Sequence, residues 1–286
     1  MSIIREHIYL FKKIIIFRKY KNNHEKLISL TGFKFFIIIN ILIKILSNNR
    51  NIISKFDYSE IKLKIKGPGM KNIFGQEHFV NIYYPNIIYI NGEIQNSIQR
   101  AYNFNQSINY VVLIWNNYLT YCGGMFYGSS DIIEFDFSEF NTSKVEYMGF
   151  MFCNCSSLIS LNISNFDTSN VMSFRYMFSG CILLTSLNLS NFNTTKLNLM
   201  YNMFDGCVNL KYINMKNFND INLSEYNNIF NKVPENVVLC VNISNVRNKI
   251  FNQIKNLKCH NIECSDDWFL YQKRLLIQLI LNVNAN

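Results

Sequence analysis

A strict period of 26 residues between Met125 and Asn228 constrains this chain more than any other feature. A Met-Phe pair opens each of four blocks, at residues 125, 151, 177 and 203, and Ile229-Phe230 opens a fifth without any insertion. The same apolar positions recur inside each block. A fixed period of this size predicts stacked repeats, because one repeat cannot bury its own apolar side and neighbours must share a core.

The two halves of each block have different patterns. Positions 8, 11 and 13 read L-x-x-L-x-L, which is the strand segment of a leucine-rich repeat, although position 16 is Phe where that repeat has Asn. In the second half, Val171, Phe174, Met177, Phe178 and Cys181 follow steps of three or four, which is helical spacing. We therefore predict an α/β fold: a leucine-rich-repeat-like solenoid with one short parallel strand and one short helix per coil.

A known family shares this repeat. The run SLISLNISNFDTSNVMSFRYMFSGCILLTSLNLSNF, residues 157–192, resembles the 26-residue repeat of BspA-like leucine-rich-repeat surface proteins. The resemblance covers about residues 110–235, and blocks two and three carry it best. It implies a protein on the surface of a microbe, with adhesion or partner binding as its role.

Composition and pattern divide the chain into four parts. They are a basic segment at 1–57, a β-rich N-terminal cap at 58–124, the repeats at 125–243, and a C-terminal cap and tail at 244–286. Alternation of Ile61, Leu63 and Ile65 and the turn signal Asn91-Gly92 predict the strands of the N-terminal cap. Such a cap is needed because an open end would expose apolar core and an unpaired edge.

The N-terminal segment predicts contact with a membrane. Residues 35–46, FFIIINILIKIL, follow eight Lys or Arg residues. The apolar run suits a signal peptide or an uncleaved anchor, and a buried helix is the alternative. We expect a cell-surface or secreted protein, possible membrane attachment through this segment, and export of the repeats.

The net charge of +9 does not indicate nucleic-acid binding. Residues 1–57 carry eleven basic against three acidic residues, whereas residues 125–228 carry five basic against nine acidic. Because the positive charge lies outside the repeats, we expect no nucleic-acid partner for them.

The cysteines fall into two groups. Cys155, Cys181 and Cys207 share position 5 of their blocks and predict a buried ladder of small apolar side chains. Three others lie outside the period and are candidates for a disulfide: Cys240, Cys259 and Cys264. A zinc site formed by these three and His260 is disfavoured, because the paired C-x-x-C spacing of structural zinc sites is missing.

The sequence contains no pattern of a known catalytic or cofactor site. G-x-G-x-x-G, G-x-x-x-x-G-K-[ST] and H-E-x-x-H are all missing, and the four histidines fall outside the repeats. We therefore expect no enzyme activity, no cofactor and no metal. The acidic patch of block one is expected to be a solvated face, and it comprises Asp131, Glu134, Asp136 and Glu139. Eight N-x-[ST] sites occur, which an Asn-rich chain generates freely.

The outward side of the strands is the candidate binding face, because side chains alternate along a strand. Positions 10 and 12 of the four blocks supply the candidate residues Glu134, Ser160, Ser186, Tyr212, Asp136, Asn162, Asn188 and Asn214. Tyr212 is the expected anchor. The predicted function is non-catalytic recognition of a protein or glycan ligand, and the alternatives are an intracellular leucine-rich-repeat scaffold and a structural surface-coat protein.

Overall fold

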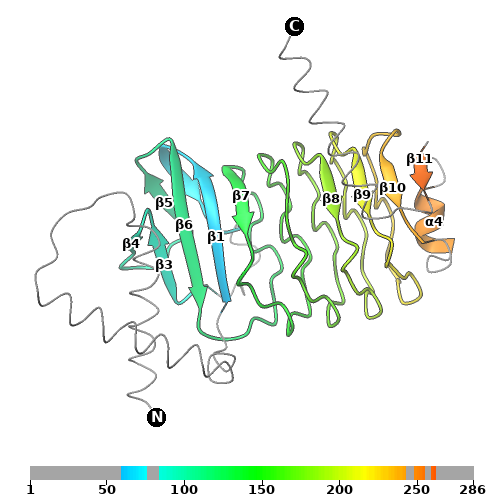
Figure 1. The fold of residues 1–286 in the computed structure, drawn as a ribbon, viewed down its shortest axis with the longest axis horizontal. Helices are drawn as coiled ribbons and strands as arrows, with labels where there is room; N and C mark the ends of the chain where they lie inside the picture. The colour runs from blue at the N-terminus through cyan, green and yellow to red at the C-terminus, as the bar shows by residue number, and fades with distance from the viewer. Residues whose placement is uncertain (1–58, 76–83, 243–247, 255–258, 262–286) are drawn as a thin grey trace, which may run out of the picture. The chain divides into compact units, whose positions relative to one another are not determined.

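A computed structural model describes residues 59–75, 84–242, 248–254 and 259–261 of the chain (Figure 1). The described elements are eleven strands and one α-helix. Two structures follow each other along the described chain: antiparallel strands in residues 59–115, then coils that repeat every 26 residues. We call these coils one to five, starting at Met125, Met151, Met177, Met203 and Ile229.

Antiparallel strands form in the region expected to be β-rich. Their bounds are β1 (Ser59–Lys66), β2 (Gly69–Asn72), β3 (Ile87–Ile90), β4 (Glu93–Ile94), β5 (Ala101–Phe104) and β6 (Ile108–Trp115). Strand β6 pairs with β3 on one side and β1 on the other, and β2 pairs with β5. Asn91 and Gly92 both have positive φ, 51° and 87°, in the predicted turn after β3.

The first coil joins this sheet instead of starting a parallel one. Its strand β7 (Ile132–Asp136) pairs antiparallel with β1, and Leu63 is opposite Phe135. The remaining strands are short and parallel: β8 (Ser186–Asn188), β9 (Tyr212–Asn214), β10 (Val238–Cys240) and β11 (Cys259–Asn261). Strand β1 therefore covers the edge that coil one would otherwise expose.

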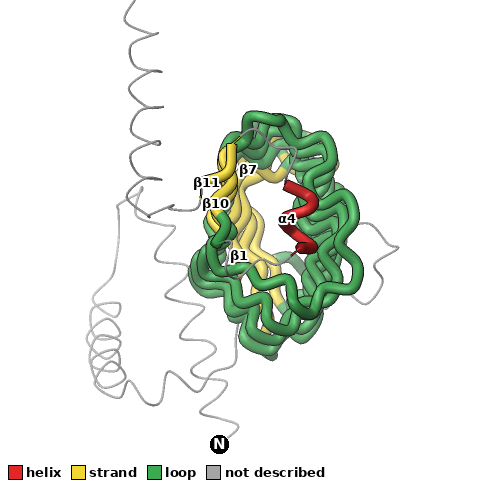
Figure 2. The backbone as a smooth tube through the Cα atoms, turned by 90° about the vertical axis from the view of Figure 1, so that its right-hand side faces the viewer, coloured by secondary structure: helices red, strands yellow, loops and turns green. Residues whose placement is uncertain are grey.

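Successive coils repeat the same path, so that Figure 2, which looks along them, shows them nearly superimposed. Residue i lies beside residue i+26: Ser186 pairs with Tyr212 in the sheet, and Ser173 forms a parallel bridge with Leu199 on the other side. In coil two the expected strand around Leu161 is reduced to one parallel bridge, between Ser160 and Ser186.

The prediction of a leucine-rich-repeat-like solenoid with one helix per coil is wrong. The second half of each coil is a series of tight turns, and the one described helix, α4 (Asn248–Ile254), lies after the coils. The reason lies in the hydrogen bonds. The amides of Phe174, Tyr176, Phe178 and Gly180 donate to the next coil, while those of Met177, Ser179 and Cys181 donate to the carbonyl three residues earlier. A helix needs consecutive bonds to the fourth residue back, which this alternation forbids. The apolar spacing of three came from the turns.

The core inside the coils consists of columns of identical side chains. Phe126, Phe152, Phe178, Phe204 and Phe230 are buried and stack in order, and the ring centroids of Phe152 and Phe178 lie 5.6 Å apart. A second column contains the position-16 phenylalanines, Phe140, Phe166, Phe192 and Phe218. The Asn expected there in a leucine-rich repeat is therefore replaced by a ring that fills the interior.

A ladder of buried threonines links the coils at a third position. The hydroxyl of Thr168 donates to the carbonyl of Asn193 (3.0 Å) and accepts its amide (2.8 Å), and Thr142 and Thr194 repeat this pattern. Asp220 takes the equivalent position in coil four. Its Oδ2 accepts the amides of Lys249 and Ile250, each at 3.1 Å, at the start of α4. The change from Thr to Asp ends the ladder and attaches the C-terminal helix.

The N-terminal segment 1–57, including residues 35–46, and the tail after Asn261 lie outside the described residues. Among the residues that are described, no helix has the length and apolar character needed to cross a membrane.

We predict that Phe178→Ala lowers the free energy of unfolding by about 3–5 kcal/mol, because it leaves a cavity between two stacked rings. The matched control is Ile182→Ala, whose side chain is 44% exposed in the same coil and which should change stability by less than about 0.5 kcal/mol. Urea unfolding followed by circular dichroism measures both. Equal losses would contradict the assignment of inward and outward positions.

We also predict that Asp220→Ala costs about 1–2 kcal/mol, the range for losing a helix N-cap. Hydrogen exchange should show faster exchange of the Lys249 and Ile250 amides, with little change at Phe178. Glu225→Ala, an exposed carboxylate of the same stretch, serves as the control. Unchanged protection of α4 would mean that Asp220 does not hold the helix.

Candidate functional site

The strand side of the coils was predicted to bind a partner, and its acidic end is already neutralised. Strand β1 runs beside β7, and the Lys62 and Lys64 ammonium groups lie 3.1 Å and 3.4 Å from the carboxylates of Asp136 and Glu134. Partial burial alone would raise the pKa of Asp136, but hydrogen bonds from Ser138 and Lys62 lower it on balance. Asp131 pairs in the same way with Lys71, at 3.0 Å. These carboxylates bind the N-terminal strands.

The middle of the strand side is open to solvent and uncharged. Ser160 and Asn162 are exposed, and Ser186 and Asn188 are half-buried. Each Asn side-chain oxygen accepts the amide two residues later, at 3.2 Å in Asn162 and 3.1 Å in Asn188, which tightens the turn after the strand. The structure brings these four predicted residues together on adjacent coils. We call them the serine–asparagine strip.

At the far end, Tyr212 and Asn214 are not on the surface. Tyr212 is 7% exposed and packs with Cys240 and Val238 of the next coil, while Asn214 is fully buried and its Nδ2 has no hydrogen-bond partner. The Tyr212 hydroxyl lies 3.3 Å from the Cys240 sulfur, and it must be the donor because Cys240 is disulfide-bonded. The expected anchor is therefore a packing residue, covered by the coil that follows it.

The cysteines of the array are buried, free thiols. Cys155, Cys181 and Cys207 each donate from Sγ to a phenylalanine carbonyl of the preceding coil, at 3.0–3.2 Å. Burial raises the thiol pKa of Cys207 to about 12, and that of Cys181 well above its ordinary value. These thiols are held as protonated packing groups.

The second cysteine group is described only in part. Cys240 forms a disulfide, so it is not available as a zinc ligand. The side chains of Cys259, His260 and Cys264 lie outside the described residues. In the described part of the chain, no three His, Cys, Asp or Glu side chains form a group that could hold a metal ion.

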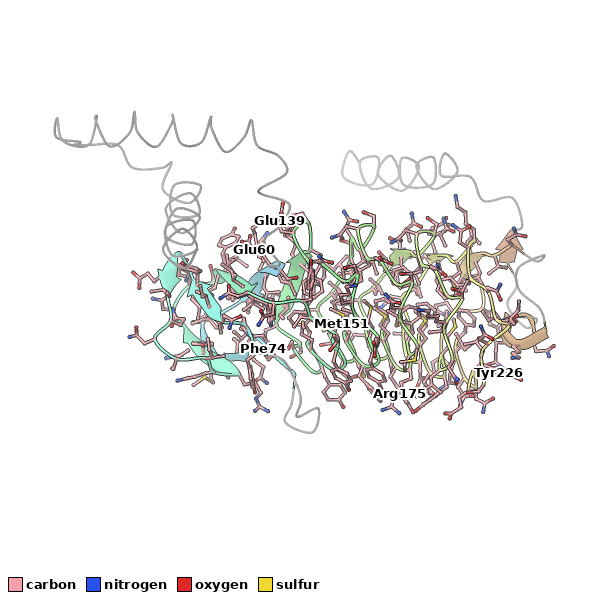
Figure 3. All side chains as sticks on the ribbon, turned by 90° about the horizontal axis from the view of Figure 1, so that it is seen from below. Glu60, Phe74, Glu139, Met151, Arg175 and Tyr226 are labelled. Carbon is pink, nitrogen blue, oxygen red and sulfur yellow. The ribbon has the colours of Figure 1, made fainter. Side chains whose placement is uncertain are left out.

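A second group of surface side chains escaped the sequence reasoning. It lies at the edge of the coils opposite the parallel strands, where Figure 3 shows Arg175 projecting outward. We call it the tyrosine–arginine cluster, and it consists of Tyr121, Tyr147, Phe150, Arg175, Tyr176 and Tyr201. Its members occupy block positions that change residue type from coil to coil, so the period conceals them. The available signal was the density of Tyr and Phe in the last few residues of blocks one to three.

The comparisons with known proteins point to one family. A family model described as "Mycoplasma protein of unknown function, DUF285" matches residues 120–238, somewhat less than half of the chain. No curated protein and no solved structure matches. The resemblance to BspA-like leucine-rich-repeat surface proteins is therefore corrected: the chain is similar to DUF285 over its coils.

We predict that iodoacetamide does not label Cys155, Cys181 or Cys207 in the native chain at pH 8, and that it labels all three in urea. Peptide mapping by mass spectrometry measures each residue. The folded thiols keep their protons, whereas unfolded thiols ionise above about pH 8.5. Their contribution to stability is therefore complete below that pH and falls as the pH rises toward the folded value of about 12 for Cys207.

The control for this pH dependence is Cys207→Ala. It removes one titrating group, so the loss of stability between pH 8 and pH 10 should be smaller than in the wild type. An identical slope would contradict a raised pKa at Cys207.

Proposed function

We propose that this chain is a non-catalytic binding module, displayed on a cell surface or secreted, that recognises a protein or glycan partner through its strand side. The serine–asparagine strip, Ser160, Asn162, Ser186 and Asn188, is the observation that carries the proposal. It is an uncharged polar surface on fixed backbone, between the ion pairs of coil one and the buried Tyr212 of coil four.

Charge and rigidity support this assignment. Interface centres are depleted of charged residues, and the strip has none. Short Ser and Asn side chains lose little conformational entropy when they bind, and their amide and hydroxyl groups offer both donors and acceptors. The carboxamide oxygens of Asn162 and Asn188 are fixed by their turns, so the Nδ2 groups are presented in one orientation.

The chemistry of the coils favours binding over catalysis. The thiols of coils two to four are buried and protonated, which removes them as nucleophiles. The acidic side chains of coil one are paired with lysines, which removes them as free general bases. Export is proposed from the apolar run at 35–46 behind its basic residues. An intracellular scaffold and a surface coat are the alternatives.

The test adds charge to the strip. We expect the fluorescently labelled full chain to bind the surface of intact cells, measured by flow cytometry. We also expect Asn162→Lys combined with Asn188→Lys to weaken this binding at least about tenfold, because two buried unpaired charges oppose docking. The matched control adds two lysines elsewhere, at Val208 and Ile221, which are both 48% exposed.

The outcomes separate the alternatives. Equal loss in both double variants would move the binding site away from the strip. Retention of the chain in the cytosol of its own cells, measured by fractionation, would favour the scaffold. Concentration-dependent self-association in sedimentation, without binding to cells, would favour the coat protein.

A further inference from the structure

The tyrosine–arginine cluster contains an arginine that is fixed in place by its neighbours. The Arg175 Nε donates to the Tyr147 hydroxyl, and Nη1 donates to the Tyr201 hydroxyl at 3.1 Å. The guanidinium carbon lies 5.5 Å from the ring centroid of Tyr147 and 5.2 Å from that of Phe150. Three successive coils therefore hold one cation, through two hydrogen bonds and two cation–π contacts.

The rings around Arg175 stack along the coils. Tyr121 and Tyr147 are parallel within 1°, with centroids 4.8 Å apart, and Phe150 stacks on Tyr176 at 4.7 Å. Glycine makes room for the first stack, since a Cβ on Gly123 would lie 2.5 Å from the Tyr147 ring. Faces that are stacked on each other cannot meet a ligand. The rings therefore present their edges, which carry the positive part of the aromatic quadrupole.

The backbone under the second stack is strained. Phe150 and Tyr176 have φ of 62° and 53°, a region that bulky side chains rarely adopt. Gly124, Asn202 and Asn228, which tolerate it, stand at the same block position in other coils. Two aromatic residues at this position are a local cost of the kind that accompanies binding sites.

The cluster offers hydrogen-bond donors and no matching anion. The Tyr147 and Tyr201 oxygens accept from Arg175, so their own O–H groups remain able to donate, and the guanidinium keeps further N–H groups. The salt bridges of the described residues involve Lys62, Lys64 and Lys71, and none involves Arg175. A cation, phenol protons and ring edges together fit an oxyanion.

We propose that the tyrosine–arginine cluster is a second binding site, which takes an Asp or Glu carboxylate from an acidic segment of a protein partner. The carboxylate accepts from the free side of the Arg175 fork and from the two tyrosine hydroxyls. Partner residues beside it pack against the rim of Tyr121, Phe150 and Tyr176. The cluster has the composition of an interface hot spot, in which Tyr and Arg dominate the binding energy.

The charge of the coils selects a single carboxylate over a dense polyanion. Arg175 is the one arginine between residues 125 and 228, where acidic residues outnumber basic ones nine to five. A nucleic acid or a highly sulfated chain would require a row of cations and would be repelled. An acidic sugar would normally stack on a ring face, and these faces are occupied by each other.

This site is independent of the serine–asparagine strip. The two lie on opposite sides of the coils (Figure 3), and the substitutions that test one leave the other intact. Failure of the strip to bind cells would not affect the experiment below.

The experiment selects peptides from a random phage-displayed library on the immobilised full chain. We expect the selected peptides to share an Asp or Glu, and the corresponding Asn or Gln peptide to bind at least about tenfold more weakly to the unchanged protein. Arg175→Gln should lower the affinity for the acidic peptide by a similar factor. Tyr147→Phe combined with Tyr201→Phe, which removes the hydroxyl donors, should give a smaller loss.

Lys196→Gln is the matched control, because it removes one positive charge from an exposed side chain of the same array and should leave the affinity within about twofold. Peptides without a carboxylate preference, or equal affinity for wild type and Arg175→Gln, would overturn the proposal. Arg175-dependent binding of sialyllactose without binding of acidic peptides would also overturn it, in favour of an acidic sugar. The peptide exchange from Glu to Gln keeps the test valid if Arg175→Gln unfolds.

Discussion

The alternation of backbone hydrogen bonds determines the rest of the structure. In the turn half of each coil, every second amide donates to the next coil, and those between close a turn within their own coil. Neither set is sufficient alone, since an isolated coil would leave half of these amides without partners. Coils are therefore stable only beside other coils. The phenylalanine columns and the threonine ladder follow from this, because identical residues come to lie one above another.

How much of this could be predicted depends on whether a feature repeats. The period and the inward positions could be predicted, because Phe166, Leu187 and Phe192 recur with their equivalents and each is buried. The helix could not, since Phe174, Met177 and Cys181 have the same spacing in a helix and in a series of three-residue turns. Sequence spacing reveals which side chains are neighbours. It does not reveal whether an amide bonds to its own coil or to the next one.

The sites divide in the same way. Ser160, Asn162, Ser186 and Asn188 lie together as predicted, because they come from the regular middle coils. The ends follow other rules: β1 supplies lysines to Glu134 and Asp136, and the coil after Tyr212 buries it. The tyrosine–arginine cluster escaped notice for the opposite reason. It is built from departures from the repeat, at Phe150, Arg175 and Tyr176, where one coil differs from its neighbours.

The fixed hydrogen-bond partner between coils also limits how such a chain can change its length. One extra residue in coil three would reverse the roles of all later amides in that turn and move Phe178 out of its column. Whole copies of 26 residues can be gained or lost from the middle without that penalty, since each new coil meets neighbours of its own kind. The coil that carries Asp220 is the exception, because it alone ends the threonine ladder in a helix cap. Growth of this chain is therefore quantised, and duplication of an internal coil is its natural step.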